Sequence, residues 1–557
     1  MLVMVPCVNR LLPVACTAWL VSLLMIVPQA REQAPQQSRA TNPHRDLSLF
    51  AHSDMCIACH NHLSTPDGED VSIGTMWRAT IMANSARDPY WHASVRREVN
   101  DHPTRAADIQ DECASCHMPM AQRIARAAGA KGEVFAHLPI DKDDTPLQRI
   151  AADSISCTLC HQIALDTLGT PDSFDGNFVM KPTPRDGARR IYGRYNVDAG
   201  RRTIMRSVSG FVQEEAPHVK QSELCASCHT LITEALGPDG SVVGKLHEQM
   251  NYQEWRHSAF QLEQRGCQSC HMPAADGPVR IASVLGDLRD SLARHVFVGG
   301  NAFMLRMLNR YRAELGVTAL GSELEATARA TVRQLQQDSA TVGRSSVQLA
   351  DTTLSFVVDV HNLTGHRFPT GYPARRAWLH VVIGKAVGNI VFESGKVEPS
   401  GMIRGNDNDT DGSTFEPHYQ TITAPDQVQI YESILGDPAG RPTTGLLTAI
   451  GYLKDNRLLP RGFDKATAPS EIGVYGAAAK DTTFTDGGDR VEFRVPVTGS
   501  GPVRVDVELR YQSIGFRWAN NLEKYDAPEP ARFVSYYKAT SAASAIVVAA
   551  AAASVTR

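Results

Sequence analysis

One five-residue pattern constrains this chain more than any other feature. Cys-x-x-Cys-His occurs five times, and these motifs use every cysteine beyond Cys16. Two thiols three residues apart can each form a thioether with a haem vinyl group, and the following histidine then offers an imidazole nitrogen to the iron. The sequence therefore predicts five covalently bound c-type haems. The motifs are Cys56–His60, Cys113–His117, Cys157–His161, Cys225–His229 and Cys267–His271.

Each motif supplies two covalent anchors and one axial ligand. The predicted thioether-forming side chains are Cys56, Cys59, Cys113, Cys116, Cys157, Cys160, Cys225, Cys228, Cys267 and Cys270. The predicted proximal iron ligands are His60, His117, His161, His229 and His271.

Paired cysteines also serve in zinc sites, disulfides and redox pairs, and each of these uses accounts for less of the pattern. Two Cys-x-x-Cys pairs could hold a structural zinc ion through four thiolates, and an exported chain could use its cysteines in disulfides. A thioredoxin-like redox pair is a third alternative, and it belongs to a βαβ context that the sequence does not show. None of these alternatives requires a histidine directly after the second cysteine.

The spacing of the motifs predicts how residues 49–300 fold. The intervals between motifs are irregular, so the segment does not read as a fixed-period repeat. Five haems in so short a stretch leave little room for an ordinary side-chain core, and we expect the porphyrins to form much of it. Short helices and long loops would pack around them, and the Gly-, Pro- and Asp-rich stretch 169–196 fits such a loop.

Residues 301–345 predict two helices that brace the haem-binding part. Apolar side chains recur there at helical spacing. The second helix is expected to start at Ser322, with Glu325 completing a capping box. The predicted apolar faces are Phe303, Met304, Met307, Leu308, Tyr311 and Leu315 in the first helix, and Leu324, Ala328, Thr331 and Leu335 in the second.

Residues 346–557 change to a period of two, which is typical of half-buried strands. Alternating runs occupy Leu354–Val360, Val491–Val495 and Val503–Tyr511, and Trp378–Ile383 predicts a more buried strand. The terminal Ala545–Ala553 predicts a closing strand, with an Ala-rich helix as the alternative. The predicted fold class is α+β multidomain, with a mainly helical and loop-rich multihaem domain followed by an antiparallel β-sandwich domain.

Residues 1–30 resemble an export signal. Arg10 precedes the apolar stretch Leu11–Val27, and Ala30 offers a small residue for cleavage. An uncleaved anchor is the alternative, because the stretch nearly reaches membrane-spanning length. We expect cleavage, a flexible linker over residues 31–48, and a periplasmic or extracellular location.

The charge pattern restricts the class of partner. The formal net charge is −4, and no run of basic residues suggests binding to nucleic acid. The expected partners are redox proteins that donate and accept electrons. Membrane association would come from an uncleaved N-terminus or from a membrane complex.

The second axial ligand of each iron decides between a carrier and a catalyst. A histidine or methionine in that position leaves the iron six-coordinate and suited to electron transfer, whereas an open position admits a substrate. For any one of these side chains, an ordinary surface or core position is the alternative. The candidates are Met82, His137, His218, His247, His295 and His366.

Two of these candidates have distinctive contexts. Met82 lies between two haem motifs in a segment that contains Trp77, and a Met ligand would raise the reduction potential of its haem. His366 lies directly after a predicted strand, in the Gly- and Pro-bounded loop Gly365–Gly371. From that loop it could reach into the haem-binding part and join the two domains through one iron.

A further pattern suggests a calcium site. Asp407, Asp409 and Asp411 alternate before Gly412, as the first ligands of a calcium loop do. The twelfth position is His418 rather than glutamate, so a plain acidic turn is the alternative. The predicted cofactors are thus five haem c groups, with Ca²⁺ as a candidate in addition.

The chain resembles the multihaem cytochrome c superfamily, which includes the tetrahaem carriers of ammonia oxidisers, the pentahaem nitrite reductases and the octahaem enzymes. The resemblance rests on the five motifs, on Tyr252–Ser258 and on the Gly365–Gly371 loop, and it covers about Leu49–Gly371. In relatives, a segment like 254–260 supplies a distal histidine where this chain has Phe260. The Cys-x-x-Cys-Lys motif of the nitrite reductases does not occur, which disfavours that activity.

The sequence leaves three functions to compare. The first is an exported pentahaem protein that passes electrons between redox partners. The second is a multihaem oxidoreductase that acts on a small nitrogen or sulfur compound at one open-coordinate haem. The third is a subunit of a larger respiratory or extracellular conduit, in which the β-rich domain is an assembly module.

Overall fold

The computed structural model describes residues 49–142, 145–183, 187–385, 389–498 and 501–556. These residues belong to one compact unit, His44–Arg557. The predicted leader and linker, residues 1–48, lie outside the described residues. Within the part of the chain that the structure describes, no helix has the length and apolar character needed to cross a bilayer.

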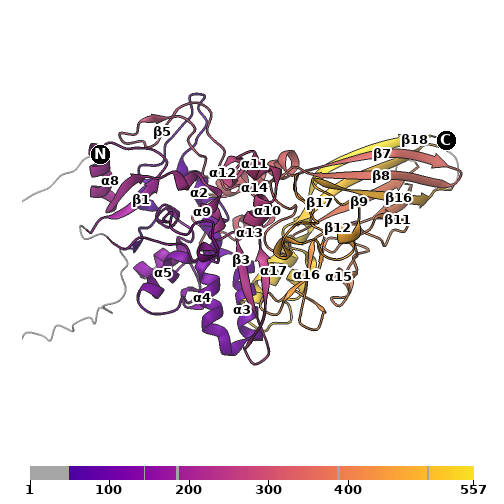
Figure 1. Cartoon of the computed structure of the whole chain (residues 1–557), viewed down its shortest axis with the longest axis horizontal. Helices are drawn as coiled ribbons and strands as arrows, with labels where there is room; N and C mark the ends of the chain where they lie inside the picture. The colour runs from indigo at the N-terminus through magenta and orange to yellow at the C-terminus, as the bar shows by residue number, and fades with distance from the viewer. Residues whose placement is uncertain (1–48, 143–144, 184–186, 386–388, 499–500, 557) are drawn as a thin grey trace, which may run out of the picture. The chain divides into compact units, whose positions relative to one another are not determined.

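The haem-motif part consists mainly of short helices and loops, as its sequence predicts (Figure 1). Four of the five motifs overlap a helix of one or two turns, and the second motif ends the longer α4 (Ala106–His117). A helical turn places residues three apart on one face, so both thiols of a motif can reach one porphyrin edge. The α-helices of this part are α1 (Asp54–Ile57), α2 (Ile73–Arg78), α3 (Pro89–Asp101), α4, α5 (Pro119–Ala127), α6 (Pro146–Ala152), α7 (Cys157–Cys160), α8 (Ala199–Ser209), α9 (Ser222–Ala226), α10 (Asn251–Arg256), α11 (Ala259–Leu262) and α12 (Cys267–His271).

Several 3₁₀ turns and three small sheets complete this part. The pair β1 (Arg189–Gly193) and β2 (Phe211–Glu215) is parallel, whereas the other two pairs are antiparallel. These pairs are β3 (Leu231–Leu236) with β4 (Val242–Gln249), and β5 (Val279–Arg280) with β6 (Leu288–Arg289). The 3₁₀ turns are η2 (Met82–Arg87), η3 (Pro103–Arg105), η4 (Phe135–His137), η5 (Pro171–Ser173) and η6 (Pro217–Lys220).

The two predicted bracing helices are present as α13 (Ala302–Arg310) and α14 (Gly321–Asp338). The predicted apolar face of α14 is buried in full. The predicted capping box is wrong, because Glu323 rather than Glu325 accepts the backbone N–H of Leu320 at 2.9 Å. The helix starts one residue earlier than expected, and its third residue is therefore Glu323.

The β-rich part contains two larger sheets. One has the order β10-β9-β17-β18 with β12 on β9, and the other has the order β11-β16-β8-β7. Their inward side chains join one apolar cluster, in which Phe356 and Phe493 pair across β8 and β16 with ring centroids 4.9 Å apart. The strands are β7 (Ala340–Ala350), β8 (Thr353–Asn362), β9 (Arg376–Gly384), β10 (Ile390–Ser394), β11 (Thr421–Ile422), β12 (Ile430–Tyr431), β16 (Gly488–Pro496), β17 (Val503–Gln512) and β18 (Ala545–Val555).

These sheets contain the strands that the alternating runs of the sequence predict. The four internal runs are strands, and Ala545–Val555 is the closing strand rather than an Ala-rich helix. Strand β7 begins at Ala340, earlier than the change of period at residue 346 suggested. The pairing is antiparallel except that β11 runs parallel to β16. The fold class is a mixture of helices and several sheets, and the sandwich arrangement stays a prediction.

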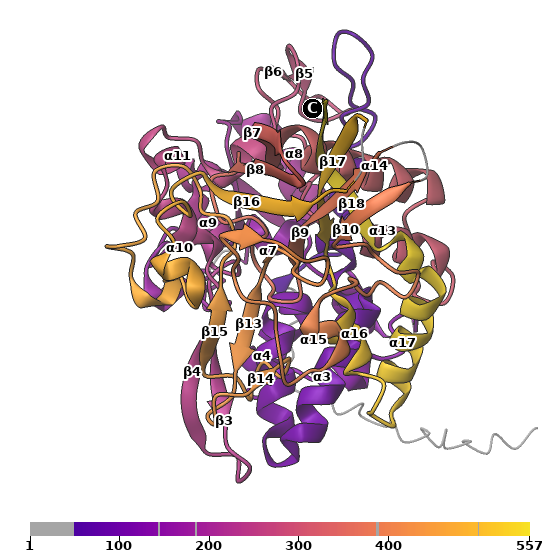
Figure 2. The same ribbon diagram turned by 90° about the vertical axis from the view of Figure 1, so that its right-hand side faces the viewer.

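A third sheet connects the β-rich part to the haem-motif part. It consists of β13 (Ser433–Gly436), β14 (Pro442–Thr443) and β15 (Gly451–Asp455). Figure 2 shows the β3–β4 hairpin beside it, and the Tyr452 hydroxyl donates to the carbonyl of His247. The remaining helices and turns are α15 (Asp407–Thr410), α16 (Phe516–Asn520), α17 (Pro528–Thr540), η7 (Ser470–Ile472), η8 (Ala477–Lys480) and η9 (Ser541–Ala543).

The C-terminal helix α17 returns to the haem-motif part and packs on α3. Its Phe533 lies edge-on to Tyr90 with ring centroids 5.0 Å apart, and Glu529 accepts two hydrogen bonds from Arg96 at 2.8 and 2.9 Å. One apolar cluster contains side chains of α3, α13, α14 and α17. Residues far apart in the sequence therefore share a core next to the haem motifs.

Candidate haem-binding site

The fold brings the five motifs into one connected group. The thiols of Cys56 and Cys157 lie within hydrogen-bonding distance, which joins the first motif to the third. The same holds for Cys116 with Cys228. The thiols of Cys225 and Cys267 form a third pair within hydrogen-bonding distance. The second, fourth and fifth motifs are thereby connected in turn.

Contacts outside the cysteines support this order. The backbone N–H of Ala51 donates to the hydroxyl of Thr158 inside the third motif, at 3.2 Å. Ser222, just before the fourth motif, accepts the N–H of Cys267 at 3.1 Å. Leu159 and Cys228 contact the same apolar cluster, which links the third motif to the fourth. All five motifs are therefore neighbours of at least one other.

Backbone carbonyls orient four of the five proximal histidines. Nδ1 of His60 lies 2.8 Å from the carbonyl of Ile281, and Nδ1 of His161 lies 2.6 Å from that of Tyr192. His271 and His117 make the same contact with Val298 and Ser85, at 2.5 and 3.3 Å. A carbonyl can only accept, so the proton is on Nδ1 and the lone pair of Nε2 is left for a metal.

Burial keeps these imidazoles in the neutral form that binds iron. It lowers the pKa of His117 and that of His229 to about 4. For His229 the nearby His271, Arg375 and His366 lower the pKa further. A histidine must be neutral to donate its lone pair, so no proton competes with the metal at neutral pH.

Two proximal histidines face a second imidazole across a gap that fits an iron atom. The ring centroids of His161 and His295 are 6.5 Å apart, and those of His271 and His366 are 6.3 Å apart. Two metal–nitrogen bonds of about 2 Å, plus about 1.1 Å from each nitrogen to its ring centre, give about 6.2 Å. The rings are tilted by only 23° and 16° from parallel. The residues present therefore fit two bis-histidine haems.

The second histidines are oriented in the same way as the first. Nδ1 of His295 lies 2.9 Å from the carbonyl of Ala293, and Nδ1 of His366 lies 2.8 Å from that of Arg367. Each Nε2 is thus left for the metal. Burial lowers the pKa of His295 to about 4 and also lowers that of His366.

Among the ring pairs that the structure describes, none joins His137, His218 or His247 to a proximal histidine. His218 has its Nε2 engaged by the carbonyl of Ile163 at 2.8 Å, and Nδ1 of His137 contacts the side chain of Gln148 at 2.9 Å. His247 lies on β4, and Met82 begins η2. Among the rings that the structure describes, no second imidazole stacks against His60, His117 or His229. The sixth ligands of all five irons stay predictions.

A cavity beside the first motif provides a further test of fit. It measures about 480 Å³ and is lined by His52, Asp54, Met55, Ala58, Arg149 and Val208. Helix α8 supplies Val208 and buries none of its own side chains, and Ile204 and Val208 are 43% and 55% exposed. Apolar side chains of a helix normally face a partner, and a porphyrin is a partner of suitable size and polarity.

The second motif has neighbours that sequence reasoning missed. Trp91 stacks on His117 with ring centroids 4.5 Å apart and planes 3° from parallel. Burial raises the pKa of the Cys113 thiol, and the charges of three carboxylates raise it further, those of Glu112, Glu248 and Glu98. The nearby aromatic run Tyr90–Trp91 was visible in the sequence, but nothing in its pattern indicates contact with a haem motif.

The three aspartates of the predicted calcium site do not converge in the structure. Asp409 is buried, and its carboxylate accepts hydrogen bonds from Arg376 at 2.7 and 2.9 Å and from the N–H of Ile403 at 2.8 Å. The carboxylate of Asp411 accepts hydrogen bonds from the N–H and the hydroxyl of Ser413. The Arg376 guanidinium thus occupies the position that a cation would need, and the alternating carboxylates form an acidic turn.

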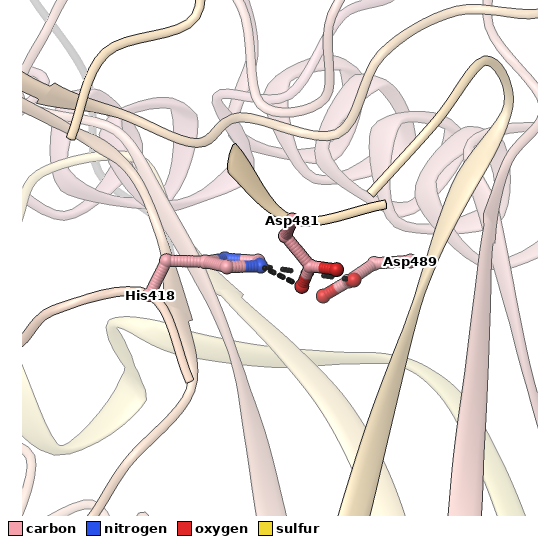
Figure 3. A group of neighbouring side chains, drawn as sticks. All are labelled: His418, Asp481 and Asp489. Carbon is pink, nitrogen blue, oxygen red and sulfur yellow. Dashed lines mark hydrogen bonds and ion pairs between the residues drawn. The ribbon is translucent and has the colours of Figure 1, made fainter. Parts of the chain in front are cut away.

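A different group of possible metal ligands lies in the β-rich part (Figure 3). One ligand atom from each of the buried side chains His418, Asp481 and Asp489 falls within 4.8 Å of the others. Nδ1 of His418, however, accepts from the side-chain amides of Gln429 and Asn456, at 2.8 and 3.1 Å. The proton must therefore be on Nε2, which donates to Asp481 at 3.1 Å.

The orientation of the two amides is fixed by backbone partners. The Gln429 carbonyl oxygen accepts the N–H of Tyr419 at 2.8 Å, and the Asn456 carbonyl oxygen accepts the N–H of Glu432 at 3.0 Å. A metal-bound histidine uses its second nitrogen as a donor, and His418 has two donors facing that atom. The group in Figure 3 is therefore a hydrogen-bonded cluster and carries no metal assignment.

The comparisons with known proteins agree with this geometry at the level of the fold. The chain is similar to the crystal structure of a penta-haem cytochrome c552 from Thermochromatium tepidum, with a TM-score of 0.52 and 16% sequence identity. The similarity covers 91% of this chain and 100% of that chain. No protein-family model and no curated protein matches the sequence. The structural likeness shows a shared fold.

Proposed function

We propose that this chain is an exported pentahaem c-type cytochrome that passes electrons between redox partners through covalently bound haems. The observation that carries the proposal is the proximity of the motifs, since thiols of neighbouring motifs lie within hydrogen-bonding distance in three places. Haems anchored at such cysteines would lie edge to edge. An enzyme with isolated cofactors would have no need of that continuity.

The residues of the chain have separable tasks in this role. The ten motif cysteines anchor the porphyrins, and bound haem iron supplies one-electron exchange between its ferric and ferrous states. His161 with His295, and His271 with His366, would hold two irons six-coordinate, which excludes substrate from them. The carbonyls of Ile281, Tyr192 and Val298 fix the ring orientations.

The location and partners follow from the same proposal. Haem attachment of this kind belongs to an exported protein, and the residues before 31 would provide the signal. Electron donors and acceptors would be proteins that approach exposed haem edges. The β-rich part would cap the haem group or dock one of these partners.

An oxidoreductase is the second candidate, because acid groups gather beside the second motif. Burial raises the pKa of Glu248 to about 8 and that of Glu112 to about 7, so both would retain protons near neutral pH. The hydroxyls of Tyr90 and Tyr372 lie 3.2 Å apart nearby. Proton donors beside an open iron would suit reduction of a small nitrogen or sulfur compound.

One experiment separates the two candidates. The purified holoprotein is assayed for haem by pyridine haemochrome, and its dithionite-reduced form is titrated with carbon monoxide. The carrier proposal expects five haems and no stoichiometric carbon monoxide binding. One equivalent bound per chain would favour the oxidoreductase, and turnover of nitrite, hydroxylamine and sulfite would then be measured. A haem count far from five would overturn both candidates.

A further inference from the structure

The loop that carries His366 is anchored by one fully buried carboxylate. Glu254 of α10 is 0% exposed. Its Oε2 accepts hydrogen bonds from the backbone N–H of Arg367 at 3.1 Å and from the hydroxyl of Thr370. These two donors lie at the ends of the segment Arg367–Thr370, directly after His366. One side chain from the haem-motif part therefore holds both ends of this segment.

The same residue of the loop connects Glu254 to the imidazole. Arg367 donates its N–H to Glu254, and its carbonyl accepts from Nδ1 of His366 at 2.8 Å. The carbonyl of His366 is held in turn by Asn362 at 2.7 Å and by Thr364 at 2.8 Å. The position of Arg367, together with the Thr364 hydroxyl 3.2 Å from the same Nδ1, therefore sets the direction in which the His366 ring points.

Charges around Glu254 make its position hard to vary. Arg457 lies 3.3 Å from Glu254 Oε1 and donates to Asp455 through two nitrogens, at 2.8 Å each. Arg367 also pairs with Asp455. Burial raises the pKa of Asp455, but Arg367 and Arg457 outweigh it and hold that pKa below its usual value. Two guanidinium groups and two carboxylates thus form a buried quartet with no net charge.

Within this quartet, the side chains of Glu254 and Arg367 do not form a hydrogen bond with each other. Glu254 Oε1 receives no hydrogen bond, and Nε of Arg367 donates none, although the two atoms lie 4.0 Å apart. Buried polar atoms without partners are uncommon, so a competing interaction must keep these two apart. The hold on the loop is such an interaction, because Glu254 Oε2 is committed to the backbone of Arg367 and to Thr370.

Packing closes the loop from the other side. The ring of Phe260 lies against Gly365, where an added Cβ would come within 2.9 Å of it. Phe368 exchanges two backbone hydrogen bonds with Leu458, both 2.9 Å long. The loop therefore has one tight apolar contact, one backbone ladder and a buried carboxylate, Glu254, that accepts a hydrogen bond from its backbone.

We propose that Glu254 is a positioning residue that holds His366 opposite His271 and lowers the reduction potential of the haem at the fifth motif. The inference rests on the proposed role of His366 as an iron ligand. The carboxylate of Glu254 balances one guanidinium charge near the ligand, so its loss would leave a net positive charge that disfavours the oxidised iron. Removing the charge alone should raise the potential, and removing the side chain should release the ligand.

Two substitutions of the holoprotein test the proposal. Glu254→Gln keeps an oxygen that can accept from Arg367 and Thr370, so all haems should stay low-spin while the midpoint potential of one haem rises. Glu254→Ala leaves both donors without an acceptor, so one haem should become high-spin and bind one equivalent of carbon monoxide. Electron paramagnetic resonance, redox titration and carbon monoxide binding give these readouts.

The matched control is Asp409→Asn. It weakens another buried arginine–carboxylate pair, that of Asp409 with Arg376, away from the His366 loop. Spin states and potentials should stay native in this variant, even where its stability falls. The same spectroscopic changes in Asp409→Asn would mean that the Glu254 effects come from general destabilisation, and the proposal would be overturned.

A third variant separates this inference from the proposed ligand. His366→Ala should open one iron to carbon monoxide. If it does not, His366 is not a ligand and the ligand assignment itself fails. If it does, but Glu254→Gln and Glu254→Ala keep native spin states and potentials, only the positioning role is overturned. If Glu254→Ala does not incorporate haem, an unchanged potential in Glu254→Gln decides against the role.

Discussion

At the residue scale, single hydrogen bonds determine which nitrogen of each histidine can bind iron. The sequence identifies His161 and His271 as ligands, because each follows the second cysteine of a motif. It does not show that their Nδ1 atoms face the carbonyls of Tyr192 and Val298, since those contacts join residues 31 and 27 positions apart. The motif is local, whereas the orientation of its ligand depends on tertiary structure.

The pairing of His161 with His295 leads to a direct prediction. His295→Ala removes the proposed sixth ligand, so the reduced variant should bind about one more equivalent of carbon monoxide per chain than the parent protein. His257→Gln is the control, because His257 is exposed and its Nδ1 contacts the carbonyl of Gln253. An unchanged carbon monoxide stoichiometry in His295→Ala would contradict the pairing.

Asp489 gives a prediction for the dependence of stability on pH. Burial raises its pKa to about 7, above the value of about 3.9 expected in the unfolded chain. The folded state therefore binds the proton more tightly, and this stabilisation is complete below pH ~4 and lost as the pH rises through about 7. Replacement by asparagine removes the titrating group and should flatten this decline.

The raised pKa of Asp489 determines how much the free energy of unfolding should change with pH. A shift of about three pKa units corresponds to about 4 kcal/mol in the free energy of unfolding, and relaxation around the carboxylate would reduce it to about 2–4 kcal/mol. Denaturant unfolding of the parent protein and of Asp489→Asn between pH 4 and pH 8 measures the difference. His418, whose pKa burial lowers to about 4, contributes in the opposite direction in both proteins. If the free energies of unfolding of the two proteins ran parallel with pH, the raised pKa of Asp489 would be excluded.

At the scale of helices and strands, sequence periodicity correctly predicted the elements that bury one face. Alternation predicted β8, β16 and β17, and helical spacing predicted α14, because each buries apolar side chains on one side. The ends of elements were predicted less well. The cap at Glu323 and the start of β7 depend on a few hydrogen bonds, which the apolar pattern does not record.

The pair of Phe356 with Phe493 gives a prediction at this scale. The two rings stack between the central strands of one sheet and are fully buried. Phe493→Ala should lower the free energy of unfolding by about 3–5 kcal/mol, since it leaves a cavity in the shared core. Arg494→Ala, on the exposed face of the same strand, should change it by less than about 0.5 kcal/mol. Thermal unfolding followed by circular dichroism compares the two, and similar losses would argue against the packing.

At the scale of the whole described molecule, the haem motifs and the strands share their cores. One apolar cluster contains Ala93 of α3, Met304 of α13 and Phe533 of α17. The sequence predicted the helical face around Met304 but not the return of α17, because the partners lie more than 200 residues apart. The same limit applies to the ligands, where His366 was a candidate from its loop while its partner His271 could not be named.

The shared core predicts a single unfolding transition. Phe533→Ala removes an aromatic ring that is 0% exposed and contacts Tyr90 and Tyr537. The haem Soret signal and the far-ultraviolet β signal should therefore shift together to lower temperature, by an amount that corresponds to about 3–5 kcal/mol. Separate transitions, with only the β signal shifted, would show that the two parts unfold independently.

The thiol pairs between motifs also affect how the chain must be assembled. Cys56 lies beside Cys157, Cys116 beside Cys228 and Cys225 beside Cys267, each within reach of the other. In an oxidising compartment, adjacent thiols form disulfides, and each such bond would remove one anchor from two different haems. In such a compartment, maturation of the chain would require either a supply of reductant or haem attachment before the motifs come together. The close spacing that would let electrons pass between haems makes the newly made chain sensitive to oxidation.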